Sequence, residues 1–263
     1  MLIDTHAHIH FDQFKDNLDE VFENAKKANI ESIITVGTNL EDSIKALDFV
    51  VNNNNIPIAK GIKLFASIGI HPHDAQSDAR NLAKLEGLIE DNKYKNALVA
   101  IGECGLDYYK SESSKSYQKE ALISQIELAQ KFNLPIIFHV RNAWDDFFDV
   151  IEKYPNLRGV IHSFTGNKDT VTTALQYNLC FGLNGIMTFT KDQNQLEAVK
   201  AIPSQKLLLE TDCPFLAPVP FRGKQNEPSY IIETAKFMAN LRNVSFDDLV
   251  SQSSFNAKEL FGI

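Results

Sequence analysis

Short runs of apolar and β-branched residues alternate along this chain with longer segments whose apolar residues recur at helical spacing. The apolar runs predict eight strands, over residues 2–8, 32–36, 64–70, 97–101, 135–140, 159–164, 179–183 and 207–212. The helical spacing predicts helices over residues 12–29, 40–51, 82–89, 118–132, 144–154, 168–177, 196–202, 229–241 and 246–261. Such alternation is typical of βαβ units and a parallel sheet.

The number of these units favours a closed barrel. Eight of them in 263 residues fit a (β/α)8 TIM barrel, which routinely fills a chain of this length as one domain. Composition does not shift along the chain and the sequence does not repeat internally, so we predict a single TIM-barrel domain over residues 1–263. A doubly wound open sheet is the alternative. It is disfavoured because polar residues follow many strands, whereas that fold gathers them at one switch point.

Charge and cysteine content narrow the function classes. The net charge of -8 argues against a protein that coats nucleic acid non-specifically, although bound metal ions could still supply a local cationic site. Cys104, Cys180 and Cys213 form no C-x-x-C pair, which argues against a disulfide framework or a zinc ribbon. We expect a reducing, cytoplasmic compartment, no signal peptide and no membrane contact.

The candidate chemistry lies where the predicted strands end, and in barrel enzymes the C-terminal strand ends carry the active site. A solvated surface would instead scatter histidines over helices and loops. The side chains found at these ends are His6, His8, His71, Glu103, His139, His162 and Asp212.

This set of imidazoles and carboxylates predicts two divalent metal ions. The ligand types suit zinc, manganese or iron better than an all-oxygen magnesium or calcium cage. This preference does not identify the ion, and magnesium, manganese and zinc all stay candidates. Four of the imidazoles and the two carboxylates make six ligands, which are too many for one tetrahedral ion, and a carboxylate can bridge two ions. Glu103 comes from the middle of the ring of strands, so we expect it to be the bridge.

Several motifs resemble the TatD family of metal-dependent hydrolases, which lies within the wider amidohydrolase-like barrels. They are I-D-T-H-A-H at residues 3–8, P-I-I-F-H-V-R-N-A-W-D at 135–145, L-L-L-E-T-D-C-P at 207–214, G-I-H-P-H at 69–73, G-E-C-G-L-D-Y at 102–108 and P-F-R-G-K-Q-N-E-P at 220–228. One departure is visible. The family usually has Asp or Asn two residues after the second histidine of the first motif, and this chain has His10 there.

The resemblance implies a metal-dependent deoxyribonuclease, with 3′ to 5′ exonuclease behaviour, that hydrolyses phosphodiester bonds by a two-metal-activated water. On the family pattern, His6, His8 and Asp212 hold one metal. His139 and His162 hold the other, and Glu103 bridges them. The expected partner is DNA, either single-stranded or at its 3′ ends, and we expect a monomer.

Roles follow for the residues around these ligands. We expect Asp212 to be both ligand and general base. We expect Arg141 and Arg222 to bind phosphate; the alternatives are a salt bridge to Asp145 or Asp146 for Arg141 and loop anchoring for Arg222. His71 would contact substrate or the leaving group, or else bond to backbone. The two remaining histidines, His10 and His73, are expected to support ligands or to lie at the surface.

Each of several further side chains near the strand ends has two possible roles. Asp4 and Glu210 share a strand face with His6 and Asp212, so each would orient a ligand or join an internal polar network. Cys104 and Cys213 have the wrong parity to be ligands and are expected to pack in the core. Four aromatic residues could stack on bases, although packing is the expected role of each one: Tyr108, Tyr109, Phe164 and Phe221.

Two other functions compete with the nuclease. The same barrel could hydrolyse small phosphoesters, amides or lactones, because fold and metals do not determine the substrate. A barrel that binds metal or nucleic acid without turnover is the third possibility, and the full ligand set with Asp212 argues against it. The sequence does not distinguish DNA from RNA, exonuclease from endonuclease, or one metal from another.

Overall fold

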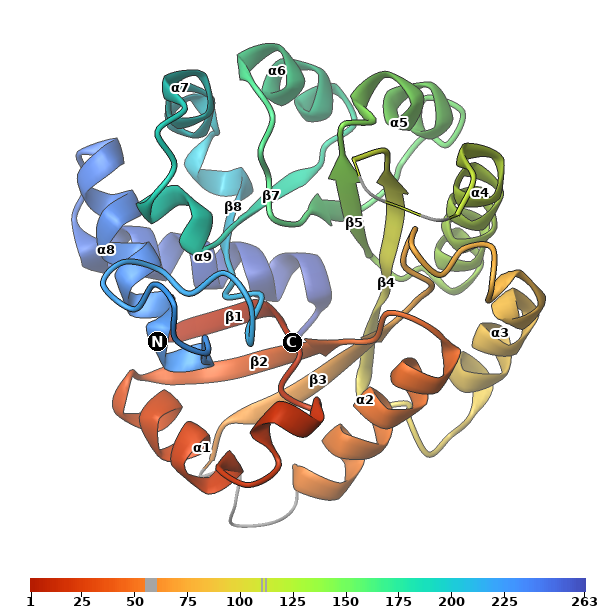
Figure 1. Ribbon diagram of the computed structural model, residues 1–263, viewed down its shortest axis with the longest axis horizontal. Coiled ribbons are helices and arrows are strands. Elements are labelled where there is room, and N and C mark those ends of the chain that lie inside the picture. Colours follow the sequence, from red (N-terminus) through yellow and green to blue (C-terminus); the bar gives the residue numbers. More distant parts are fainter. Residues whose placement is uncertain (55–60, 110, 112) are drawn as a thin grey trace.

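The strands form one nearly closed ring at the centre of the molecule. The computed structural model describes residues 1–54, 61–109, 111 and 113–263. Its eight parallel strands follow one another in space in their chain order, β1 to β8. Helices surround them (Figure 1). The fold is therefore the predicted (β/α)8 barrel, because a doubly wound sheet would reverse its strand order at a switch point.

The elements have the following bounds. The strands are β1 (Leu2–Ala7), β2 (Ile30–Val36), β3 (Lys63–Ile68), β4 (Leu98–Asp107), β5 (Ile136–Arg141), β6 (Gly159–Ile161), β7 (Cys180–Leu183) and β8 (Leu207–Leu209). The α-helices are α1 (Leu18–Lys27), α2 (Leu40–Asn53), α3 (Leu82–Glu90), α4 (Lys115–Phe132), α5 (Trp144–Ile151), α6 (Lys168–Gln176), α7 (Gln193–Ala201), α8 (Ile231–Arg242) and α9 (Phe246–Phe261). Short 3-10 helices are η1 (Asp12–Phe14), η3 (Ala79–Asn81), η4 (Gly185–Thr188), η5 (Ser204–Lys206) and η6 (Pro228–Tyr230).

The first and last strands meet through their C-terminal ends. The backbone N–H of Asp212 donates to the carbonyl oxygen of His6 at 2.8 Å, and the N–H of His8 donates to that of Cys213 at 2.8 Å. The Thr5 hydroxyl donates to the Leu209 carbonyl at 3.1 Å. These bonds connect β1 and His8 to β8 and the segment after it, at the level of the predicted ligands.

The largest difference from the predicted elements is in β4, which continues to Asp107 although the predicted strand ends at residue 101. Gly105 allows this continuation. A Cβ atom there would lie 1.9 Å from the carbonyl oxygen of His139 on β5, so a larger residue would force the two strands apart. The G-E-C-G-L-D motif is therefore strand, although its two glycines are typical of a turn.

Two other strands are shorter than predicted. β6 ends before His162, and β8 ends before Asp212. Ser163 (φ 47°) and Asp212 (φ 57°) both take left-handed backbone conformations, which no strand can include. The predicted helix over 12–29 is also interrupted, and forms η1 followed by α1.

The end of the barrel opposite the predicted ligands is covered by α9. Its residues Leu260 and Phe261 pack with apolar side chains of the strands, among them Ile3, Ile137 and Leu208. Cys104 and Cys213 are buried in the core, as predicted, and both are free thiols. In the part of the chain that the structure describes, every helix is too short or too polar to cross a membrane.

Candidate metal centre

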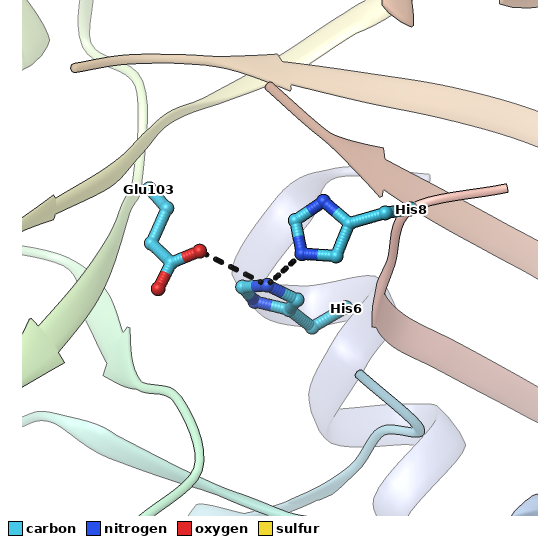
Figure 2. Close-up of side chains that lie close together, drawn as sticks. All are labelled: His6, His8 and Glu103. Atoms are coloured by element: carbon cyan, nitrogen blue, oxygen red, sulfur yellow. Dashed lines mark hydrogen bonds and ion pairs between the residues drawn. The ribbon is translucent and has the colours of Figure 1, made fainter. Parts of the chain in front are cut away.

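The barrel brings all six predicted ligands to one end of the sheet. His6 and Glu103 project from within β1 and β4, and His139 projects from within β5. His8 and His162 come directly after β1 and β6, and Asp212 lies three residues after the end of β8. Figure 2 shows His6 and His8 directed toward Glu103 from the opposite side of the barrel.

One half of the group surrounds the Nε2 atom of His6. It lies 3.3 Å from Nε2 of His8, 3.4 Å from Oε2 of Glu103 and 3.7 Å from Oδ1 of Asp212. The same Asp212 oxygen lies 3.4 Å from Nε2 of His8. His6 and His8 are almost fully buried.

The other half surrounds the second oxygen of Glu103. Its Oε1 lies 2.7 Å from Nδ1 of His139, 2.9 Å from Nε2 of His162 and 3.5 Å from Nε2 of His71. The His162 ring also stacks on that of His6, with centroids 3.9 Å apart. The two oxygens of Glu103 therefore face two sets of histidines, which is the arrangement expected of a bridging carboxylate.

Two of the four predicted ligand histidines also have a hydrogen-bond acceptor at the ring nitrogen that faces outward. The Val36 carbonyl lies 2.8 Å from Nδ1 of His8, and Oδ2 of Asp107 lies 3.2 Å from Nε2 of His139. Such acceptors hold the proton on the outward nitrogen and leave the inward one free to bind a metal. For His162, Oε1 of Glu210 lies 3.4 Å from Nδ1, which is within ion-pair distance but makes no hydrogen bond.

Asp107 is the supporting residue that the sequence analysis missed. Its Oδ2 lies 3.0 Å from Nε2 of His73 as well as 3.2 Å from His139. Its backbone N–H and C=O are both held by the buried side chain of Gln118. Alternate residues of a strand share a face, so extending β4 through its glycines would have placed Asp107 on the face of Glu103.

The two carboxylates expected below the ligands take different roles. Glu210 contacts His162 and accepts a hydrogen bond of 2.6 Å from the backbone N–H of Ser163. Asp4 accepts bonds from the backbone N–H and the hydroxyl of Thr211, at 2.9 and 2.6 Å. Glu210 thus lies beside a predicted ligand, while Asp4 joins the polar network that connects β1 to the segment after β8.

The electrostatics of the group couple its carboxylates to its histidines. Burial alone would raise the pKa of Glu103, but the neighbouring His162, His71 and His139 hold it well below its usual value. Burial would lower the pKa of His162, yet Glu103 and Glu210 outweigh it, and that pKa lies well above its usual value. For His71 burial prevails and lowers the pKa to about 3, so this ring is neutral at pH 7.

This donor set fits divalent cations. Three overlapping groups of possible ligand atoms lie within 4.8 Å of one another: His6, His8 and Glu103; His6, His162 and Asp212; and His71, Glu103 and His139. Two pairs of imidazole nitrogens also approach each other, His6 with His8 at 3.3 Å and His139 with His162 at 3.4 Å, where a cation would satisfy both lone pairs. Imidazole with carboxylate suits zinc and manganese.

A cavity of about 700 Å³ opens above the group, and most of the predicted ligands line it. The exposed Arg141 lines it too, with its guanidinium 4.0 Å from the ring centroid of Tyr109. Asp146, offered as a salt-bridge partner for Arg141, instead pairs with Lys119 at 2.9 Å. Arg141 is therefore placed where a substrate phosphate could reach it.

Arg222 is held elsewhere. Its guanidinium lies 3.7 Å from the ring centroid of Phe189 and donates to the Ala217 carbonyl at 3.0 Å. It is absent from the described residues that line the cavity. This placement is the loop anchoring considered as the alternative, and phosphate binding by Arg222 stays a prediction.

The remaining histidines have defined partners. His71 lines the cavity and accepts from the backbone N–H of His73 at Nδ1 (3.2 Å), so its proton sits on Nε2, which faces Glu103. His73 is partly exposed and contacts Asp107. His10, at the position where this chain departs from the family pattern, is buried against Thr35 and Asp42.

The aromatic residues near the strand ends differ in exposure. Phe164 is buried in the core, Phe221 stacks on Tyr230 with ring centroids 3.9 Å apart, and the Tyr108 hydroxyl donates to Asp146. Tyr109 is 62% exposed beside Arg141. Phe215, which the sequence analysis did not single out, is 50% exposed and lines the cavity. Tyr109, beside Arg141, and Phe215, in the cavity wall, are thus two aromatic residues with exposed surface near the site.

Comparison with known proteins gives a consistent result. Residues 3–262 match the family described as "TatD related DNase". An uncharacterized metal-dependent hydrolase, YabD of Bacillus subtilis, is 39% identical over the whole of both chains. The 3′-5′ ssDNA/RNA exonuclease TatD of Erwinia amylovora is 33% identical over 95% of this chain and 96% of its own. The crystal structure of a TatD family hydrolase from Entamoeba histolytica superposes with a TM-score of 0.89 at 26% identity, covering 99% of this chain and 97% of that one.

Proposed function

Because the chain belongs to the TatD family of metal-dependent hydrolases, we propose that it is a deoxyribonuclease that removes nucleotides from the 3′ end of single-stranded DNA. The observation that carries this proposal is Glu103, whose two oxygens face separate sets of histidines beneath an open cavity. A pair of ions bridged by a carboxylate is the usual apparatus for hydrolysing phosphodiesters. The 3′-5′ exonuclease named among the relatives supports the choice of substrate.

We propose that His6, His8 and Asp212 hold one divalent ion, that His139 and His162 hold the other, and that Glu103 bridges them. The six side chains carry the donor atoms that such ions prefer, and the inward nitrogens of the histidines lie close to the carboxylates. When bound, the ions would lower the pKa of a water molecule and neutralise charge on the phosphate.

The reaction then depends on protons held by this chain. Asp212 would take the proton from the attacking water through Oδ1, which faces His6 and His8. As the water oxygen bonds to phosphorus, the bond from phosphorus to the 3′ oxygen of the preceding nucleotide breaks. His71 is neutral with its hydrogen on Nε2, so it would donate a hydrogen bond to a phosphate oxygen. The departing 3′ oxygen would receive the proton that Asp212 took from the water.

The cavity walls supply contacts for a nucleotide. Arg141 presents a planar guanidinium, which can bind a phosphate through two hydrogen bonds. Tyr109 and Phe215 expose ring faces near it, and a base can stack on such rings whatever its identity. These contacts favour a nucleic-acid end over the small phosphoesters, amides or lactones that the same metal centre could hydrolyse.

The test is a cleavage assay on single-stranded DNA labelled at either end, with Mg²⁺, Mn²⁺ or Zn²⁺ and with chelator. The expected result is shortening from the 3′ end that requires metal and stops on chelation. RNA, p-nitrophenyl phosphate and a lactone serve as competing substrates. Metal-loaded protein that leaves DNA intact but hydrolyses a small substrate would overturn the proposal, and so would metal-loaded protein that hydrolyses nothing.

A further inference from the structure

The turn between β2 and α2 contacts three residues of the candidate site through consecutive carbonyl groups. The Val36 carbonyl accepts from Nδ1 of His8 at 2.8 Å. The Gly37 carbonyl accepts from the backbone N–H of Glu103 at 3.1 Å, and the Thr38 carbonyl accepts from that of His71 at 2.7 Å. A shift of this turn would therefore move one ligand ring and two segments of backbone together.

The turn is held against the start of α2 by Asp42. Oδ2 of Asp42 accepts from both the backbone N–H and the hydroxyl of Thr38, at 2.9 and 3.0 Å. Gly37 makes the close approach possible, because a Cβ atom there would lie 2.6 Å from Cα of Ser43. Asp42 is thus the side chain that determines where the Thr38 carbonyl points.

His10 connects the two sides of the turn. Its Nε2 lies 3.0 Å from Oδ1 of Asp42, and its Nδ1 lies 2.7 Å from the hydroxyl of Thr35, directly before Val36. The His10 side chain is only 1% exposed, so its ring has little contact with solvent. A shorter Asp or Asn at this position, as in the family pattern, could not reach both partners in the same way.

We propose that His10 is a positioning residue for the active site. Through Asp42 and Thr35 it holds the β2–α2 turn, and the three carbonyls of that turn hold His8, Glu103 and His71. The inference rests on the proposed function only in that these residues belong to the proposed metal centre. It assigns a role to the residue at which this chain departs from its family.

Two variants of similar chemistry but different reach test this role. In His10→Gln the terminal amide lies where Nε2 of His10 was, so the bond to Asp42 can persist. In His10→Asn the amide lies near the former Nδ1, which preserves the bond to Thr35 alone. Glu41→Gln is the matched control, because Glu41 is exposed and lies on α2 next to Asp42.

The first measurement is hydrogen exchange of the Glu103 and His71 amides in the metal-free protein, with amides of β7 as an internal reference. Losing a hydrogen bond of ordinary strength should accelerate their exchange about tenfold in His10→Asn. His10→Gln and Glu41→Gln should exchange as the unaltered protein does. This readout needs no nuclease activity, so it remains valid if DNA is not the substrate.

The second measurement is Zn²⁺ or Mn²⁺ affinity by calorimetry. Groups that orient metal ligands typically contribute 10- to 100-fold in affinity, so we expect His10→Asn to lose about tenfold and His10→Gln to lose little. Equal changes in both variants, or no change in either, would overturn the proposal. If His10→Asn does not fold, Asp42→Asn replaces it: unchanged amide exchange in that variant would also overturn the proposal.

Discussion

Asp212 and His6 lie far apart in the sequence, but the backbone N–H of Asp212 donates a hydrogen bond of 2.8 Å to the carbonyl oxygen of His6. This bond places the Asp212 carboxylate beside the first ligand pair, with Oδ1 3.4 Å from Nε2 of His8. The left-handed backbone of Asp212 turns its side chain into the cavity, which it lines. The closure of the barrel thus brings the candidate base to the candidate ligands.

Replacing this base should abolish turnover without unfolding the barrel. We expect Asp212→Ala to lower kcat by about 10²- to 10⁴-fold, the usual contribution of a positioned general base. Cleavage of labelled single-stranded DNA and circular dichroism would be measured together. Glu259→Gln, which removes a surface carboxylate from α9, should leave both unchanged. Near-normal kcat in Asp212→Ala would refute the assigned role.

Asp107 should support metal binding through His139. Asp107→Asn weakens the acceptor that faces Nε2 of His139, 3.2 Å away, so the ring would lose its fixed tautomer. We expect Zn²⁺ affinity to fall about 10- to 100-fold in a calorimetric titration. The exposed Glu120→Gln on the adjacent helix α4 is the control. Unaltered affinity would mean that His139 is oriented by its other contacts.

Alanine substitution of the two arginines expected to bind phosphate should affect KM differently. Arg141 lines the cavity, while Arg222 is engaged by Phe189 and Ala217. We expect Arg141→Ala to raise KM about tenfold or more through loss of charge-assisted hydrogen bonds, and Arg222→Ala to leave KM nearly unchanged. Steady-state kinetics on a short DNA oligonucleotide would show this. The reverse pattern would assign phosphate binding to the loop after β8.

The Asp42 carboxylate should make stability depend on pH in the acid range. Burial would raise its pKa, but the bonds from His10 and Thr38 outweigh burial, and the pKa lies below its usual 3.8. A group whose pKa is lower in the folded state stabilises above its unfolded pKa, and this contribution is lost as pH falls through the folded pKa. Urea unfolding should therefore give a higher free energy of unfolding for the unaltered protein than for Asp42→Asn at pH 7, and this difference should narrow below pH 3.8. A difference that does not change with pH would contradict this.

Two glycine substitutions should have opposite effects on stability. In Gly105→Ala the new methyl group would lie 1.9 Å from the carbonyl oxygen of His139, and overpacking of this kind costs about 1–3 kcal/mol. In Gly87→Ala, on α3, the methyl group meets no atom within 4 Å and should stabilise the helix by about 0.5–1 kcal/mol. Thermal unfolding would compare them. Equal shifts would argue against the close approach of β4 and β5.

The gathering of the candidate ligands at one end of the barrel was predictable because it depends on local spacing and on one rule of the fold. His6 and His8 alternate along a strand, and polar residues that follow apolar runs fall at the same end of a parallel barrel. The extent of β4 was not predictable in this way. Gly102 and Gly105 are typical of a turn, and only the nearness of β5 shows that they accommodate a neighbouring strand instead. For that reason Asp107 was missed.

The supporting contacts lie beyond any local pattern. His10 and Asp42 are far apart in sequence, and so are Glu103 and Gly37, whose backbones bond to one another. The same holds for the two arginines: Arg141 ends β5 and Arg222 lies in the loop after β8, but one guanidinium lines the cavity and the other packs on an aromatic ring. Side-chain direction in loops depends on partners that spacing does not reveal.

By itself, the sequence determined the alternation of strands and helices, the barrel and the identity of the donor atoms, because periodicity and residue chemistry are local properties. Only the tertiary structure decided that the two oxygens of Glu103 face different histidines. It also decided that Asp107 and Glu210 contact the rings of His139 and His162, and that His10 contacts Asp42 beside the β2–α2 turn. Closure of the ring sets these contacts, since it fixes the distances between strands that are remote in the chain.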